Sequence, residues 1–158
     1  MNYESFRPII GVIQNISQEQ DCCSQRVSIM TTNGIVNMIV SSGTMVIDSI
    51  RLRPGMRIAA FYDTNLPVPL IYPPQYQAQI VTNLGRSQFI MLNYFDGNLT
   101  ATDNSLSLNI GRGTRVTTIN GQPFNCDLGN HVLLVWYSAT TRSIPPQTNP
   151  ERVVVLCD

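Results

Sequence analysis

Short stretches of alternating apolar and polar residues run along the whole chain, separated by turn residues. Residues 9–16, 26–31, 35–46 and 106–116 read as strands, and no stretch has a helical period of useful length. Thr32-Asn33-Gly34 and Asp96-Gly97 stand between such stretches. Asn-Gly between alternating segments is a strong hairpin signal, because both residues tolerate positive φ. We therefore predict an all-β protein.

The second half of the chain repeats the motifs of the first half in the same order. IVNMIVSSGTMV (35–46) matches LSLNIGRGTRV (106–116), and both contain Gly-Thr. LRPGMRIAAFYD (52–63) matches DLGNHVLLVWYS (127–138), and PLIYPPQYQAQIV (69–81) matches RSIPPQTNPERVVVL (142–156), with offsets that stay between 70 and 74 residues. The order indicates a tandem duplication of one β unit.

Each half contains five expected strands. The first strands are residues 9–16 and 89–95, and the second are residues 26–31 and 99–102. Five antiparallel strands with a longer link between the third and the fourth favour an OB-like barrel. We therefore predict two tandem five-stranded OB-like barrels, residues 1–83 and 84–158, with small β-sandwich halves as the alternative.

Three strands of the second half are apolar at successive positions rather than alternate ones. They are VLLVW (132–136), FIML (89–92) and VVVL (153–156). A strand with one face in water alternates, so these strands are expected to be covered on both faces. The cover is either the other half or another subunit.

The charge composition favours association between copies and disfavours nucleic acid. Charged residues make up 13% of the chain, and ten basic residues balance ten acidic ones. Every basic residue is Arg, and there is no Lys. A neutral chain lacks the basic surface that binds phosphates, and zero net charge promotes self-association. Lys commonly protects exposed strand edges, so its absence indicates edges that are shielded otherwise or used.

The N-terminal sequence MNYESFRPIIGVIQ has no basic segment followed by an apolar stretch, so we expect no signal peptide and synthesis in the cytoplasm. No apolar run reaches the length of a membrane-spanning helix, so we expect no membrane partner.

Residues that carry common enzyme chemistry are scarce. His131 is the single histidine, and no serine stands in a Gly-x-Ser-x-Gly elbow. GRGT (111–114) lacks the Lys of a phosphate-binding loop. We therefore predict no enzyme activity, no catalytic residue, no metal and no cofactor.

The four cysteines do not have the spacing of a zinc site, and they are candidates for cross-links between subunits: Cys22, Cys23, Cys126 and Cys157. Neighbouring cysteines bond to each other only through a strained ring, so Cys22 and Cys23 are expected to bond elsewhere. Four reduced thiols are the alternative.

Two Pro-Pro-Gln loops are the most distinctive motifs. In an OB-like barrel the loop between the fourth and fifth strands flanks the usual ligand face. The candidate binding residues are Tyr72, Pro73, Pro74, Gln75, Tyr76, Trp136, Arg142, Pro145, Pro146 and Gln147. Aromatic rings with Gln suit stacking and hydrogen bonding to a sugar or a base. The alternative is a stiff loop that closes the barrel or joins the two halves.

FYDTNLPVPLIYPPQY (61–76) and YSATTRSIPPQTNPERVVVL (137–156) resemble an uncharacterised family of short duplicated β-barrel-like proteins from clostridia and related spore-forming Firmicutes. The resemblance covers most of residues 7–157. It implies a spore-forming source and a role in spore or cell-surface assemblies, and it brings no activity and no catalytic residue.

The sequence thus favours a non-enzymatic, self-assembling subunit of a fibre, coat or surface appendage, whose partner is another copy of the chain. Its contacts are expected at β-edges and cysteines. The alternative is a module that binds an oligosaccharide, a peptide or, less favourably, nucleic acid at the Pro-Pro-Gln loops.

Overall fold

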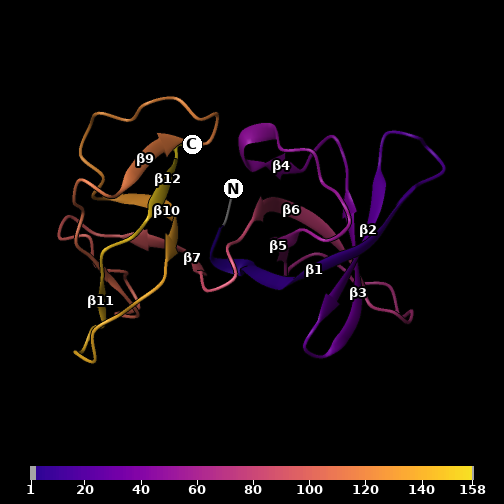
Figure 1. Cartoon of the computed structure of the whole chain (residues 1–158), viewed down its shortest axis with the longest axis horizontal. Coiled ribbons are helices and arrows are strands. Elements are labelled where there is room, and N and C mark those ends of the chain that lie inside the picture. Colours follow the sequence, from indigo (N-terminus) through magenta and orange to yellow (C-terminus); the bar gives the residue numbers. More distant parts are fainter. Residues whose placement is uncertain (1–2, 158) are drawn as a thin grey trace. The chain divides into compact units, whose positions relative to one another are not determined.

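A computed structural model describes residues 3–157 of the chain. The protein is all-β; its two short 3-10 helices, η1 (Tyr3–Ser5) and η2 (Ile47–Ser49), have three residues each. The chain forms two compact units, one covering Glu4–Arg86 and one beginning at Ser87 (Figure 1). The boundary expected after residue 83 falls at the start of the connection that links them.

The first half is a closed barrel of five strands. These strands are β1 (Phe6–Gln18), β2 (Gln25–Thr31), β3 (Gly34–Val40), β5 (Arg57–Asp63) and β6 (Gln75–Asn83). They pair in the order β3, β2, β1, β5, β6, and a parallel pairing of β3 with β6 closes the ring. The two-residue strand β4 (Met45–Val46) pairs in parallel with β6. The all-β prediction is confirmed, and so is a barrel in the first half.

Strand β1 allows closure because it changes partner along its length. Phe6–Val12 pairs with β5, whereas Val12–Gln18 pairs with β2. Gly11 lies at this change, where a Cβ atom would stand 2.3 Å from the carbonyl oxygen of Met30. Only glycine allows such a close backbone approach. The barrel interior is filled by Ile13, Val27, Ile29, Met38, Ile58, Ala60, Ala78 and Val81.

The described part of the second half contains six strands, none of which is longer than seven residues. They are β7 (Phe89–Phe95), β8 (Ser107–Leu108), β9 (Arg115–Thr118), β10 (His131–Tyr137), β11 (Gln147–Thr148) and β12 (Arg152–Leu156). Strands β7, β10, β12 and β9 form a four-stranded sheet in that order, and β8 pairs with β11. The sheet is not closed, so the structure does not show the second barrel that the sequence predicted.

The missing closure has a local cause at the end of β7. The Asp96 carboxylate accepts hydrogen bonds from the backbone N–H of Asn98 at 2.9 Å and of Thr100 at 3.1 Å, so the chain turns immediately. The portion of the strand that would pair as β1 pairs with β2 is therefore absent. Residues 99–102, predicted as a strand, form only isolated bridges from Thr100 and Ala101.

The pairing order of the two halves is nevertheless the same. Strands β1, β5 and β6 correspond to β7, β10 and β12, and β4 lies parallel to β6 as β9 lies parallel to β12. The Gly-Thr motifs also make one equivalent contact. Thr44 Oγ1 donates to the carbonyl oxygen of Ala78 at 2.8 Å, and Thr114 Oγ1 donates to that of Pro150 at 2.7 Å.

Strand β10 is buried on both of its faces. Leu133 and Val135 belong to the core of the second half, and Leu134 and Trp136, which alternate with them, are also buried. The rest of this core is Phe95, Ala101, Leu106, Leu108, Leu128, Val153 and Val155. The continuous apolar run in the sequence therefore corresponds to a strand without a solvent face.

Candidate functional site

Residues 64–74, which join β5 to β6, form what we call the proline loop. Its first end is held by Ser5, whose hydroxyl donates to the Asp63 carboxylate at 2.6 Å and whose carbonyl accepts from Thr64 N at 2.9 Å. The backbone N–H of Asn65 also donates to Asp63, at 2.9 Å. The hydroxyl of Ser5, and then the N–H of Asn65, hold the pKa of the Asp63 carboxyl below its usual value of 3.8.

The other end of the proline loop is held by β3. The N–H of Asn37 donates to the carbonyl oxygen of Pro74 at 2.8 Å, which extends the parallel pairing of β3 with β6. Four prolines stiffen the segment between these anchors: Pro67, Pro69, Pro73 and Pro74. The loop is thus fixed at both ends and has few backbone conformations available between them.

The tip of the proline loop is apolar and open to solvent. Leu70 is fully exposed, Tyr72 is 88% exposed and Ile71 is 53% exposed. Leu66 and Val68, earlier in the same loop, are also exposed. The loop therefore carries five of the eleven large hydrophobic side chains that are exposed in the described chain. Five such side chains on one loop differ from single exposed apolar residues, which are ordinary on protein surfaces.

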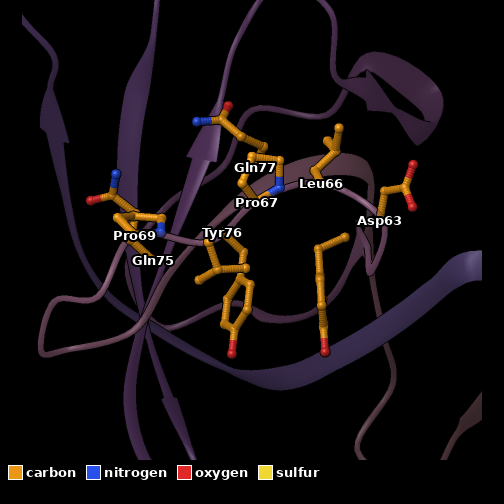
Figure 2. Close-up of a pocket in the computed structure, with 9 residues that line it drawn as sticks. Asp63, Leu66, Pro67, Pro69, Gln75, Tyr76 and Gln77 are labelled. Carbon is orange, nitrogen blue, oxygen red and sulfur yellow. The ribbon is translucent and has the colours of Figure 1, made fainter.

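A small hollow of about 70 Å³ lies between the proline loop and the start of β6 (Figure 2). Asp63 stands at one end of the row of labelled side chains, and Pro69 and Gln75 stand at the other. The rings of Tyr62 and Tyr76, which line the hollow, stack with centroids 4.3 Å apart. This volume is well below the range of about 300–1,000 Å³ that is typical of small-molecule sites.

A larger groove of about 500 Å³ lies on the same half, and we call it the tyrosine groove. Its walls come from the first part of β1, the β2–β3 turn with the start of β3, the end of the proline loop and the start of β6. They are Pro8, Ile9, Ile10, Thr31, Thr32, Asn33, Ile35, Val36, Tyr72, Pro74 and Tyr76. None of these residues is charged, so the groove suits an uncharged partner with apolar or hydroxyl groups.

The second Pro-Pro loop, residues 138–146, has the same base as the proline loop and a different tip. The carbonyl oxygen of Pro146 accepts from Ser107 N at 2.9 Å, as that of Pro74 accepts from β3. The peptide bonds Tyr72-Pro73 and Ile144-Pro145 are both cis.

Hydroxyl groups hold this second loop together. Thr141 Oγ1 lies 2.6 Å from Ser143 Oγ and accepts from Gln147 N at 3.0 Å, and Ser143 Oγ donates to the carbonyl of Pro145 at 2.8 Å. Arg142 is exposed beside them, and Ile144 is the one large exposed hydrophobic residue of this loop. The second loop is therefore polar where the first is apolar.

Trp136 is not a surface residue of the loop. It is buried to 3% exposure on β10, and the guanidinium of Arg152 lies over its ring at 5.0 Å from the centroid. The structure therefore brings Tyr72, Pro74 and Tyr76 together in one groove, while Trp136 is a buried residue of strand β10.

The four cysteines are exposed free thiols, and no disulfide joins any of them within residues 3–157. Cys22 and Cys23 lie in the turn between β1 and β2, where the Asp21 carboxylate accepts from Cys23 N at 3.1 Å and Ser24 N at 3.0 Å. Cys126 lies in the connection between β9 and β10, and Cys157 follows β12. All four are therefore accessible to an external thiol or oxidant.

His131 has a local structural contact. Its Nδ1 lies 2.9 Å from the carbonyl oxygen of Gly129 and 3.1 Å from that of Leu128, so the neutral ring carries its proton on Nδ1 and donates to them. The imidazole ring also packs edge to face against the ring of Phe124, with the two ring centroids 5.6 Å apart. Within the described residues no cluster of three or more His, Cys, Asp or Glu side chains is placed to hold a metal ion. The same residues include no helix long and apolar enough to cross a membrane.

Few strand edges in the described residues are open for pairing with a strand of another copy, although the sequence analysis expected contacts at such edges. The first-half barrel is closed, and β7 is an edge of the open sheet. The outward N–H of Tyr94 is already bonded to Asn93 Oδ1 at 2.8 Å, and the carbonyl of Tyr94 accepts from Thr102 N at 3.1 Å. By alternation, only Ile90 and Leu92 then point their backbone groups along this edge without a partner among the described strands.

The chain matches no protein-family profile, no curated protein and no solved structure. The site therefore rests on its own geometry. Sequence reasoning placed Tyr72, Pro74 and Tyr76 in a binding loop but did not include Leu70, Ile71 or the groove walls from β1 and the β2–β3 turn. The run PVPLIY (67–72), apolar residues between prolines where a loop is expected, was the signal for the exposed tip.

Proposed function

We propose that this chain is a non-enzymatic assembly subunit, built from two OB-like β units, whose copies associate through the proline loop of the first half. The observation that carries the proposal is the exposure of Leu70, Ile71 and Tyr72 on one stiff loop. Exposed apolar clusters of this kind are typical of protein–protein contacts, and aromatic residues are enriched in such contacts.

The rigidity of the loop supports the same proposal. A flexible apolar loop loses conformational entropy when it binds, and this loss weakens the contact. The proline loop is held by Ser5 at one end and Asn37 at the other, so much of its freedom is already lost in the free protein. Its side chains are therefore presented for binding at a lower entropic cost.

Charge does not oppose contact between copies. The chain has no net charge at neutral pH and contains no Lys. The proline loop itself contains no charged residue. Two copies therefore approach without net electrostatic repulsion, which fits a partner that is identical to the chain itself.

Cysteine cross-links are a second, covalent part of the proposal. The thiols of Cys22 and Cys23 are exposed at a hairpin turn, and Cys126 and Cys157 are exposed elsewhere. Two thiols from neighbouring copies give one disulfide when an oxidant such as dissolved oxygen accepts their two hydrogen atoms. Spore-coat or cell-surface assembly, implied by the family resemblance, is the setting in which such bonds would persist.

A second candidate function is ligand binding in the tyrosine groove. Tyr72 and Tyr76 line this uncharged groove together with Thr32 and Asn33. Aromatic rings with hydroxyl and amide groups suit a neutral oligosaccharide. This candidate predicts a monomeric protein that binds neutral oligosaccharides and loses binding when Tyr72 is replaced by Ala.

The test is sedimentation velocity of the untagged protein over a range of concentrations, with and without reductant, joined to negative-stain electron microscopy. We expect oligomers or polymers for the wild type and monomers for Leu70→Asp. Ile144→Asp is the matched control, because Ile144 is 91% exposed on the equivalent loop of the second half and should leave association unchanged.

Reductant and a Cys22→Ser/Cys23→Ser double variant distinguish association through disulfides from reversible association through the proline loop. We expect both to lower the covalent fraction and to leave the reversible, loop-dependent association in place. A wild-type protein that stays monomeric at every concentration in both conditions would overturn the proposed function.

A further inference from the structure

We infer that the tyrosine groove is the receptor for the proline loop of a second copy, so that two copies exchange loops across a two-fold axis. The inference rests on the proposed function and adds to it the receiving surface and the symmetry of the contact. The loop and the groove are neighbours on one surface, because Tyr72 and Pro74 belong to the end of the loop and also line the groove.

The chemistry of the loop and that of the groove match. Neither the residues that line the groove nor residues 64–74 include a charged side chain. The groove wall contains Ile10, Ile35 and two tyrosines, and the loop offers Leu70 and Ile71. Apolar residues in a proline-rich segment that dock against an aromatic-lined groove follow a common mode of peptide recognition.

The groove is large enough for a peptide segment. Its volume of about 500 Å³ lies within the range of about 300–1,000 Å³ for ligand pockets. The hollow beneath the loop, at about 70 Å³, is much smaller and includes the charged Asp63 among its lining residues. The tyrosine groove is therefore the better receptor for the side chains of Leu70 and Ile71.

The position of the loop beside its own groove favours a two-fold contact. In an isologous interface the same surface of each copy meets itself, so a protrusion must find its receptor on that same surface. Leu70 is two residues from Tyr72, which borders the groove, so protrusion and receptor are neighbours. Rotation by a two-fold axis then places each loop over the groove of the other copy.

Some residues that line the groove pack against the barrel core, and others do not. Ile9 and Val36 pack on the barrel core, whereas Ile10 and Ile35 are not among the residues of that core or those packed against it. Thr32 is exposed at the groove. A change at Thr32 therefore alters the groove without removing a core contact.

The experiment uses two single variants and their mixture. Leu70→Asp disables the loop and keeps the groove, and Thr32→Arg fills and charges the groove and keeps the loop. We expect each to weaken dimerisation on the order of 100-fold or more, because a two-fold contact contains both copies of each change. Thr140→Arg, an exposed threonine of the second half, is the control and should dimerise as the wild type does.

Mixing the variants is the decisive step, followed by sedimentation equilibrium. A heterodimer of Leu70→Asp and Thr32→Arg keeps one intact loop–groove junction and pairs an Asp loop with an Arg groove at the other. We expect the mixture to recover association that neither variant shows alone. A far-UV circular dichroism spectrum equal to that of the wild type confirms the fold of each variant.

The other outcomes separate the two proposals. If the wild type dimerises, Leu70→Asp abolishes the dimer and Thr32→Arg does not, then the loop meets another surface; the proposed function stands and this inference is overturned. If both variants are monomeric and their mixture shows no recovery, the inference is likewise overturned. If the wild type itself is monomeric, the proposed function and the inference fail together.

Discussion

The hydroxyl of Thr44 and that of Thr114 should stabilise their two halves in the same way. Thr44 Oγ1 donates to the carbonyl of Ala78 at 2.8 Å and accepts from Ser41 N at 3.0 Å. Strand β6 bulges at Gln79, since Phe61 pairs with Ile80 and Tyr62 pairs with Ala78. The threonine therefore satisfies a carbonyl beside the bulge.

Replacing Thr44 by Val removes both hydrogen bonds and keeps a side chain of similar shape. Each bond contributes about 0.5–1.5 kcal/mol, so the free energy of unfolding of the first half should fall by roughly 1–3 kcal/mol. At Thr114 the second bond, from Gly111 N, is longer at 3.4 Å. Thr114→Val should therefore cost about 0.5–2 kcal/mol.

Urea unfolding measures both effects. With a slope of about 1–3 kcal/mol/M, the midpoints should move by roughly 1 M. Trp136 is the single tryptophan and lies in the second half, so its fluorescence reports Thr114→Val, and far-UV circular dichroism reports Thr44→Val. Thr140→Val, at an exposed threonine, is the control and should stay within about 0.5 kcal/mol. Shifts no larger than that control would refute the assigned role of the two threonines.

Two further predictions concern the first half. Gly11→Ala should lower the free energy of unfolding by about 1–3 kcal/mol or more, because the new Cβ would stand 2.3 Å from the carbonyl oxygen of Met30. Gly43→Ala is the control, since the nearest atom to its new Cβ would be 3.8 Å away, and equal urea midpoints for the two variants would contradict the close approach at Gly11. The depressed pKa of Asp63 stabilises the folded protein above pH 3.8, and this stabilisation should be lost as the pH falls from 3.8 through the lower pKa that Asp63 has in the folded protein. In Ser5→Ala the pKa of Asp63, measured by NMR titration, should rise toward 3.8. An unchanged pKa would show that Ser5 is not the main cause of the depression.

Local sequence patterns predicted much of the fold. Alternation and the Asn33-Gly34 turn placed β2 and β3, and the prediction for residues 89–95 coincides with β7. The repeated Gly-Thr and Pro-Pro motifs correspond to equivalent hydrogen bonds in the two halves. These features were readable because they depend on residues that are neighbours in the chain or on the order of motifs.

Closure of the barrel was decided by tertiary structure. The motifs of the two halves are alike, yet their first strands differ in length. The first part of β1 pairs with β5 and its second part pairs with β2, whereas β7 pairs with β10 and ends where the Asp96 carboxylate accepts hydrogen bonds from two N–H groups. Whether a sheet closes into a barrel depends on how many residues of distant segments pair in register. The hydrophobic pattern of a single segment does not specify how many residues will pair.

The candidate site divides in the same way. The sequence by itself determined that Tyr72 and Pro74 belong to a stiff loop, because proline restricts the backbone wherever the chain folds. Tyr76, which the sequence assigned to the same loop, lies on strand β6. Tertiary structure decided that Trp136 lies in the interior, that Leu70 stands fully in solvent, and that β1 and the β2–β3 turn complete a groove beside the loop. Burial is a property of what packs against a residue, and those neighbours come from segments far away in the chain.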